Sequence, residues 1–498
     1  MGRIDWKERY LINTLSSYVN LAARLLCGLI IFRFLYAHWD GQEFGFWSFM
    51  WSMFGYAIVL DFGLGYTVER AVARRSEENK AYVSSLLSTV FWSFVVLGGV
   101  LFGCGVLCKD LIFAAIDVPP EYAEEFTRAY FYFFAGLAVL LPVGIFPPML
   151  DGIQRVDLGN WVRASNSLVH FGFTLYAITH EWRFSAIMLL SMIGSAAPAI
   201  IGGLVAFKKI PGLSLNPRLF SWRAVKEQLS FSLTAYFISF SNILLTQTDR
   251  IIIGVMLALP QVKLYQGGFK IGEMLLMYAT QVSVVVAPAA ANLAEHGSNE
   301  DQKELLMKSS RMTFILVTPF YLLAVFYLEP LIRLLTDLDV VPLSTYWVGN
   351  FLLTAIYINH IFTSSTRSVL MMSGHEKVML KISLFHAVFN IVLSFLLVGP
   401  YGIMGVAGAT LISSVLMSLF VILPITLRHI KENIWVLARF HMSGFLLALF
   451  VMVGIFGGLH LIAPIAPDSN IIDLGWRAIA VALPTLALSY KTIRATWS

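Results

Sequence analysis

The chain has 498 residues, of which 58% are hydrophobic and only 13% are charged, against about 25% charged residues in an average soluble domain. A soluble core cannot bury that much apolar surface, whereas a bilayer accepts it, because each membrane-spanning helix needs ~20 mostly apolar residues. The net charge of +5 is small, and the three cysteines show neither metal-ligand spacing nor a disulfide framework. The composition therefore excludes a soluble globular domain and predicts an all-α, multi-pass membrane protein.

Taken in chain order, the apolar segments predict about 14 transmembrane helices. We place these spans at roughly 11–37, 44–68, 83–107, 126–150, 159–180, 184–207, 227–258, 262–293, 311–335, 344–372, 378–398, 403–427, 436–463 and 471–490. The first span is longer than the apolar core of a signal peptide, about 7–15 residues, so we interpret it as a retained helix. The longest stretches outside the spans are too short for a catalytic domain.

Lysine and arginine give the orientation, because cytoplasmic loops carry more of them than external loops. If both termini share one side, that side holds 23 of these residues in its loops and the opposite side holds 5. If one span were missing from this set or wrongly included, all loops after it would be assigned to the wrong side, and the charge difference between the two sides would be lost. The charge distribution therefore predicts that the N-terminus and the C-terminus both lie in the cytoplasm.

An internal repeat divides the predicted spans into two sets. The turn at Leu150–Arg155 matches Met372–Lys377 at an offset of 222 residues, and Phe44–Trp47 corresponds to Leu264–Gly267 at a similar offset. Six spans in each repeat give the two copies the same orientation. We therefore expect two pseudo-symmetric six-helix lobes, residues 1–208 and 209–427, followed by two extra C-terminal helices in residues 428–498.

Polar residues follow single faces of several predicted spans. On the first span Asn13, Ser17, Asn20 and Arg24 recur at helical spacing, and similar stripes follow the seventh, eighth and tenth spans. Because both lobes supply stripes, we expect a hydrated cavity between the lobes. Polar packing between helices is the alternative explanation, and it accounts well for serine, threonine and asparagine.

Charged residues within the spans are the candidate functional groups, and none of them forms a catalytic or metal-binding motif. The candidates for substrate binding are Arg24, Lys270, Arg33, Arg367, Asn20 and His360. The candidates for proton or ion coupling are Asp61, Asp249 and Glu273. Simpler roles remain open, since Glu273 lies one turn from Lys270, the acidic residues can pair with nearby arginines, and membrane histidines often serve packing.

Five short motifs occur in a fixed order on this frame: Glu43–Ser48, Leu60–Gly65, Thr248–Gly254, Gly374–Lys377 and Tyr401–Ala409. With them the sequence resembles polysaccharide and O-antigen flippases of the multidrug/oligosaccharidyl-lipid/polysaccharide exporter superfamily. The resemblance spans residues 1–427, and the last two helices agree only in number.

The resemblance implies a transporter without cofactor or enzymatic activity in the bacterial inner membrane. Its implied substrate is an undecaprenyl-diphosphate-linked oligosaccharide for exopolysaccharide, capsule or O-antigen synthesis, moved by ion- or proton-coupled alternating access. In such flippases a cationic cavity receives the diphosphate, and Arg24 and Lys270 are the positions that match it. Membrane lipids, a polysaccharide polymerase and the export machinery are further expected partners, whereas nucleic acid is not.

Two other functions compete with this hypothesis. A multidrug or cation antiporter of the same superfamily would need an acidic cavity, but the charges in the middle of the spans are mainly arginine and lysine. A polytopic glycan polymerase would need a sizeable external loop with catalytic residues, and the stretch 108–125 is short for that purpose. A flippase of cell-wall precursors stays open alongside one of exopolysaccharide units.

Overall fold

The structure is a computed structural model of the chain. It describes residues 6–60, 64–75, 80–153, 155–284, 286, 290, 293, 298–372, 374–443, 445–462 and 471–497. Every regular element within these ranges is a helix, which agrees with the predicted all-α class. The chain divides into two compact units, Met1–Ile243 and Leu244–Ser498, so that the boundary falls inside helix α9.

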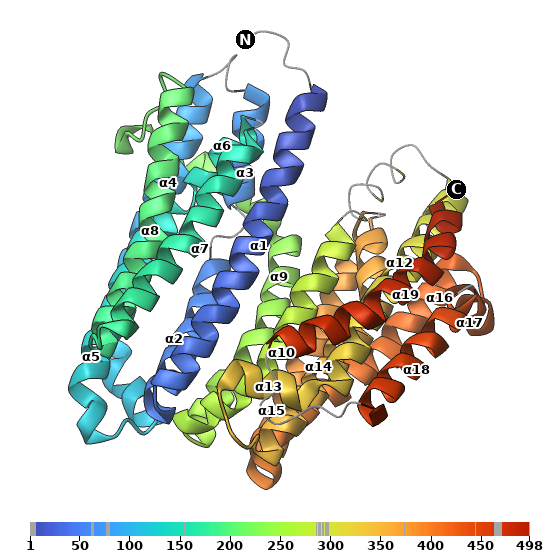
Figure 1. The fold of residues 1–498 in the computed structure, drawn as a ribbon. Helices are drawn as coiled ribbons and strands as arrows, with labels where there is room; N and C mark the ends of the chain where they lie inside the picture. The colour runs from blue at the N-terminus through green and yellow to red at the C-terminus, as the bar shows by residue number, and fades with distance from the viewer. Residues whose placement is uncertain are drawn as a thin grey trace. The chain divides into compact units, whose positions relative to one another are not determined.

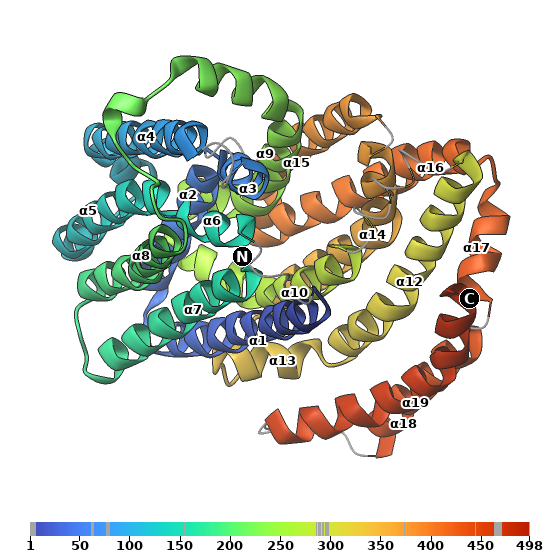
Figure 2. The same ribbon diagram turned by 90° about the horizontal axis from the view of Figure 1, so that it is seen from above.

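The first unit is a bundle in which long helices follow one another side by side. Its elements are α1 (Trp6–His38), α2 (Gly41–Val59), α3 (Leu64–Arg75), α4 (Lys80–Ala115), α5 (Pro120–Val143), α6 (Phe146–Gly152), α7 (Val156–Thr179), α8 (Phe184–Lys209), the short 3₁₀ helix η1 (Pro217–Leu219) and the start of α9 (Trp222–Met256). Helix α1 packs along α7, α7 along α8, α8 along α5 and α5 along α4 (Figure 1; Figure 2). A glycine allows the close approach of α4 and α5, because a Cβ at Gly98 would lie 2.7 Å from the Ala138 carbonyl oxygen.

Proline and glycine break helices that the sequence predicts as single spans. The predicted span 126–150 is divided into α5 and α6 around Gly144, where Pro142, Pro147 and Pro148 remove backbone donors. The predicted span 44–68 corresponds to α2 and α3, and residues 61–63 between them lie outside the described residues.

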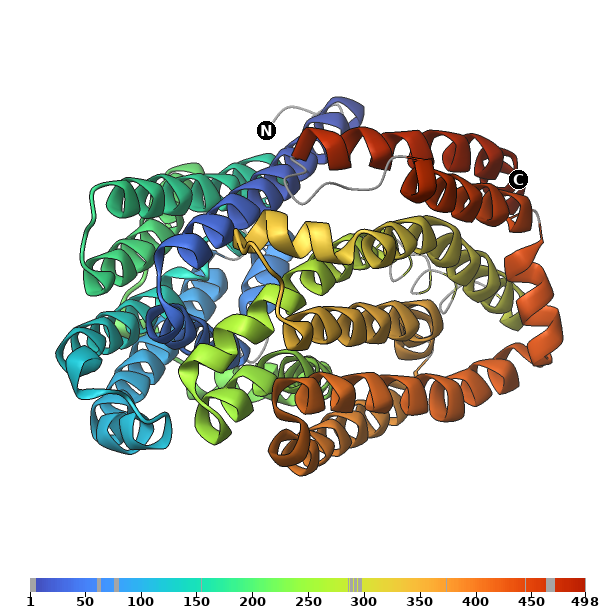
Figure 3. The ribbon, with the colours of Figure 1, turned by 60° about the horizontal axis from the view of Figure 1, so that its bottom comes forward.

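The second unit is built around α14 (Leu343–Met372), which packs against three other long helices: α10 (Leu259–Val284), α12 (Asn299–Phe326) and α15 (Glu376–Leu416). The remaining elements are α13 (Leu328–Thr336), the π-helix η2 (Met417–Ile422), α16 (Leu423–Ile430), α17 (Ile434–Met442), α18 (Leu446–Ile462) and α19 (Ile471–Trp497). Figure 3 shows α18 and α19, drawn in red, lying side by side at the end of this unit.

Helix α15 covers the predicted span 378–398 and the first part of the span 403–427, which continues through η2 into α16, and it bends between the two spans. Gly402 has non-helical dihedral angles there (φ 56°, ψ −139°), two residues after Pro400. A side chain is rarely tolerated in this backbone region. The predicted break between the eleventh and twelfth spans is thus present as a kink rather than as a loop.

Six helices in the described part of the chain are long and apolar enough to cross a membrane, or seven if the bent pair α17–α18 is one span. As far as its residues are described, each predicted span falls on one helix or on consecutive helices. The chain is therefore a multi-pass helical membrane protein, whereas fourteen crossings and the placement of both termini stay predictions.

The segment between α8 and α9, residues 210–221, runs along one face of α4, and we call it the strap. Six hydrogen bonds hold it, and in all six the group on the strap is a backbone amide or carbonyl. The side chains on α4 that bind it are Lys80, Ser84, Ser85, Ser88, Thr89 and Trp92. Serine and threonine hydroxyls can both donate and accept hydrogen bonds. One polar stripe on α4 can therefore bond to backbone amides and carbonyls of the strap that have no partner in regular secondary structure.

Candidate functional site

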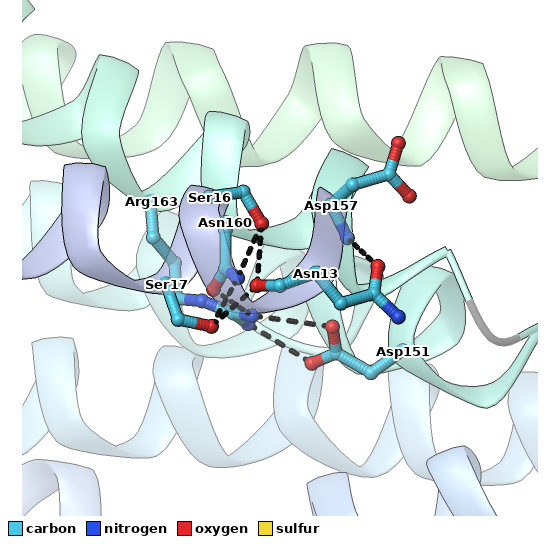
Figure 4. A network of polar contacts seen from close by, with 7 residues as sticks. All are labelled: Asn13, Ser16, Ser17, Asp151, Asp157, Asn160 and Arg163. Carbon is cyan, nitrogen blue, oxygen red and sulfur yellow. Dashed lines mark hydrogen bonds and ion pairs between the residues drawn. The ribbon is translucent and has the colours of Figure 1, made fainter. Parts of the chain in front are cut away.

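A polar network in the first unit joins α1 to α7 (Figure 4). The Asn160 amide on α7 donates to the hydroxyl oxygens of Ser16 (3.0 Å) and Ser17 (2.8 Å) on α1. Both hydroxyls donate in turn to the Asn13 carbonyl oxygen, and the Asn13 side chain accepts from the backbone amide of Asp157. The N-terminal part of the polar stripe on α1 therefore serves helix packing, which is the alternative explanation that the sequence leaves open.

The same network neutralises Arg163. Its guanidinium donates to both carboxylate oxygens of Asp151 at the end of α6 (3.0 and 3.2 Å) and to the Asn160 amide oxygen (3.0 Å). Nearby, two hydrogen bonds from the Arg155 side chain hold the pKa of Asp157 below its usual range. These charges hold α6 and α7 in register with α1 and are satisfied within the unit.

The next part of the polar stripe on α1, Asn20 and Arg24, does not take part in this network. Asn20 is half-buried and Arg24 is exposed, one and two turns beyond Ser17. The Arg24 side chain forms no hydrogen bond or ion pair with the described residues. Arg33, further along the same helix, is half-buried and does have interactions. Of the cations predicted on α1, Arg24 is thus the one whose side chain has no protein partner among the described residues.

In the second unit a buried carboxylate lies at the centre of a polar cluster. Asp249 on α9 is only 5% exposed, and one of its oxygens, Oδ2, accepts hydrogen bonds from the hydroxyls of Tyr265 (2.5 Å) and Thr410 (3.2 Å). The Asn390 amide on α15 donates to the hydroxyl oxygens of Thr410 (3.0 Å) and Ser413 (3.2 Å). Three helices, α9, α10 and α15, therefore meet at this carboxylate.

Two acceptors in this cluster remain unsatisfied by the described residues. The second Asp249 oxygen, Oδ1, and the Asn390 amide oxygen are both buried without a hydrogen-bond donor. Burying an acceptor without a partner is costly, and burying a negative charge is more costly still. A buried, oxygen-rich cluster with one carboxylate is the kind of site that a proton or a small monovalent cation satisfies.

The other cationic candidates of the second unit have partners. Lys270 contacts Glu273 with its Nζ 2.7 Å from the carboxylate oxygen, as the spacing on α10 predicts. His360 on α14 contacts the Ile356 carbonyl oxygen at 3.2 Å, and Arg367 on the same helix also has interactions within the protein.

Asp61, the remaining coupling candidate, lies outside the described residues. The sequence pattern does not reveal Asp151, Tyr265 and Thr410 as partners of the charged groups. Tyr265 lies in the repeat motif Leu264–Gly267, and Thr410 directly follows the motif Tyr401–Ala409, so the motifs mark both positions without showing their role.

Comparisons with known proteins agree with this fold. A family model described as "Polysaccharide biosynthesis protein" matches residues 14–294, more than half of the chain. An uncharacterised membrane protein of Methanocaldococcus jannaschii is 24% identical over 341 residues, which cover 66% of this chain and 63% of that protein's length.

Several solved structures share the architecture. The lipid II flippase MurJ in its inward closed conformation has a TM-score of 0.74 and 15% identity, and the match covers 97% of this chain and 100% of that chain. An inward-facing multidrug resistance MATE family transporter of the MOP superfamily has a TM-score of 0.66 and 14% identity, with 85% and 99% covered. A MOP superfamily transporter from Pyrococcus furiosus has a TM-score of 0.58 and 14% identity, with 86% and 98% covered. At these identities the likeness shows the fold alone.

Proposed function

The chain belongs to the polysaccharide biosynthesis protein family and has the fold of MOP superfamily transporters, and from this premise we propose that it flips undecaprenyl-diphosphate-linked oligosaccharides across the bacterial inner membrane. The repeat units would serve exopolysaccharide, capsule or O-antigen synthesis. An ion or proton gradient would drive the alternating access. The observation that supports an anionic substrate most directly is the exposed Arg24 in the middle of α1.

The positive charge of Arg24 carries a free-energy cost within a membrane helix, and a bound anion would reduce that cost. A cation in the middle of a membrane helix costs about 2.5–3.5 kcal/mol on insertion scales, so it needs a compensating partner. Arg163 has Asp151, whereas Arg24 has no carboxylate among the described residues. A diphosphate supplies two negative groups, and the planar guanidinium binds such a group through two parallel hydrogen bonds. Lys270, Arg33, Arg367, Asn20 and His360 are the other proposed substrate-binding residues.

Binding of undecaprenyl diphosphate by the purified full-length protein tests this role. With native mass spectrometry we expect Arg24→Ala to weaken binding roughly tenfold or more, since a hydrogen bond to a charged group contributes about 1.5–3 kcal/mol. The affinity of Arg24→Lys should fall between those of Arg24→Ala and the parent, because lysine keeps the positive charge but cannot form the two parallel hydrogen bonds of a guanidinium. The control Arg128→Gln removes a cation from an exposed pair with Glu124 and should bind like the parent. Equal binding by Arg24→Ala and the parent would contradict the proposal.

For coupling we propose Asp249, with Asn390 and Thr410 as partners, as the site of a driving proton or Na⁺. The unsatisfied Asp249 Oδ1 and the unsatisfied amide oxygen of Asn390 support this choice. Glu273 is the weaker candidate because it already pairs with Lys270. Asp61 stays a candidate from its sequence position only.

Ligand-dependent stability tests the coupling site, because a cation that binds only the folded state raises the melting temperature with its concentration. Unfolding is followed in NaCl, KCl and choline chloride, and separately across pH. We expect the parent to respond to Na⁺ or to pH, and Asp249→Asn to lose that response. Asp110→Asn, at an exposed carboxylate, should keep it. A parent protein that responds to neither Na⁺ nor pH would refute coupling at Asp249.

The main alternative is a multidrug or cation antiporter, since MATE transporters share the fold. The exposed cation on α1 favours an anionic substrate over it. If an organic cation such as ethidium, and not undecaprenyl diphosphate, bound in competition with Na⁺ or protons, the antiporter function would replace the flippase.

A further inference from the structure

A cavity of about 270 Å³ lies within the second unit, beneath the short helix α17. Its wall combines side chains from α12, α14, η2, α16 and α17, among them Phe314, Phe362, Leu419, Leu423 and Ala438. An engineered apolar cavity of about 150 Å³ is known to stay dry and bind benzene, so this one holds an apolar group of roughly ten carbons. Its lining residues include no member of the Asp249 cluster and no predicted substrate-binding residue, while His360 and Arg367 adjoin the lining residues Ile361 and Thr366 on α14.

The few polar groups in the wall are already satisfied. The Thr366 and Thr426 hydroxyls bond to each other (2.8 Å), and the Ser310 hydroxyl donates to a backbone carbonyl of its own helix. The His441 ring nitrogen Nδ1 contacts the Leu437 carbonyl oxygen at 2.7 Å. An ordered water needs two to four polar partners, and these groups have little hydrogen-bonding capacity left to offer. The wall therefore favours a hydrocarbon occupant.

Helix α17 has the form of an interfacial helix. The residues that line the cavity recur at positions 434, 437, 438, 441 and 442, which is one helical face. Trp435, at the edge of this face, is 77% exposed, and tryptophan is enriched where a membrane meets water. The axis of α17 is bent by 61° from that of α18, the apolar helix that follows it. If α18 crosses the bilayer, α17 lies closer to the membrane plane.

Positive charges flank the lining residues in the sequence. Arg428 and Lys431 lie between the cavity residues of α16 and those of α17, and Arg439 directly follows Ala438. None of these three side chains forms an ion pair within the described part of the chain. Glu432, the acidic residue among them, is engaged by Lys303 (3.0 Å). The border is therefore free to receive an anion.

We propose that this cavity and its basic border form a binding site for an anionic glycerophospholipid, with one acyl chain beneath α17 and the phosphate at Arg428, Lys431 and Arg439. The charge pattern places this border on the predicted cytoplasmic side, where the membrane surface is negatively charged. An apolar cavity alone would accept any hydrocarbon, and the basic border selects the negatively charged headgroup. The site is independent of the transport mechanism proposed above.

The test uses full-length protein, stripped of lipid, with palmitoyl-oleoyl phosphatidylglycerol as the probe and native mass spectrometry as the readout. Palmitoyl-oleoyl phosphatidylcholine and undecaprenyl phosphate serve as comparison lipids. We expect phosphatidylglycerol to bind more tightly than phosphatidylcholine. Ala438→Phe should fill the cavity and abolish specific retention, while Val436→Phe, the same side chain on the outer face of α17, should leave retention unchanged.

The charges are tested separately. Replacing Arg428, Lys431 and Arg439 by glutamine should lower affinity roughly fivefold for each charge removed. The matched control replaces Lys208, Lys209 and Arg218 by glutamine, three exposed cations elsewhere on the same predicted side, and should bind like the parent. Size-exclusion profiles verify that each variant is folded. Unchanged retention in Ala438→Phe, equal binding of both phospholipids, or preferential retention of undecaprenyl phosphate would overturn the proposal.

Discussion

The Arg163 guanidinium and the Arg24 guanidinium show two ways to keep a charge on a membrane helix. Arg163 donates to both oxygens of Asp151, whose side chain is only 16% exposed, so each group compensates the other. Arg24 is exposed on α1 and has no such partner among the described residues. Removal of the first charge is therefore expected to change stability, and removal of the second to change ligand binding.

Arg163→Gln should destabilise the protein by about 1–3 kcal/mol, because it leaves the partly buried Asp151 carboxylate without its ion pair. Adding Asp151→Asn to it should recover part of that loss, since the two residues are coupled. Thermal unfolding in detergent measures both effects. Arg128→Gln, which breaks a pair whose two side chains are largely exposed, should stay within about 1 kcal/mol of the parent. A strictly additive double variant would show that the pair contributes nothing.

At the scale of the helix, the kink of α15 depends on one backbone position. Gly402 has a positive φ of 56°, which a residue with a Cβ adopts only under strain. Gly405, one turn later, lies so close to the Leu397 carbonyl oxygen that a Cβ would be 2.1 Å away. The bend therefore brings two turns of the same helix into direct contact. Thr410, after the bend, donates to the Asp249 carboxylate, and Asn390, before it, donates to Thr410.

We expect Gly402→Ala to destabilise the protein by about 1–3 kcal/mol, the usual cost of a strained backbone position. Because the kink orients Thr410, the same variant should also weaken the Na⁺ or pH response at Asp249. Gly399→Ala is the matched control: it lies three residues earlier in the helix, and a Cβ there would meet no atom within 4 Å. If both variants unfold at the parent temperature, the kink is not held by the glycine.

The helices themselves were predictable, because apolar segments of membrane length are a strong local signal. The internal breaks of these helices were harder to predict, because proline alone does not mark them. Helix α5 ends one residue after Pro142, whereas α8 and α12 continue past Pro198 and Pro319. The pairing of Lys270 with Glu273 follows from spacing on one helix. That of Asp249 with Thr410, 161 residues apart, depends on how α9 and α15 pack, and no pattern within either helix reveals it.

At the scale of the whole chain, the distribution of positive charge predicts the orientation. Fusions of a reporter at Lys209 and Asn299 should report the cytoplasm, and fusions at Asp40 and Asp117 the external side, because these loops differ in lysine and arginine. Paired enzyme reporters, one active only inside and one only outside, provide the measurement and its own control. A single site on the wrong side would contradict the fourteen-span topology.

The strap also bears on how the sequence of this chain can change. Its six hydrogen bonds use only strap backbone groups, while the α4 side chains that bind it lie more than 120 residues earlier in the chain. The bonds to α4 therefore do not depend on the side chains of residues 210–221, although Gly212, at a φ of 93°, and Asn216, whose side chain accepts from the Arg218 amide, are constrained for other reasons. A chimaeric protein can therefore be made from two related sequences that are joined within the strap. It keeps these bonds if its α4 retains the stripe, whichever of the two sequences supplies the residues after the junction.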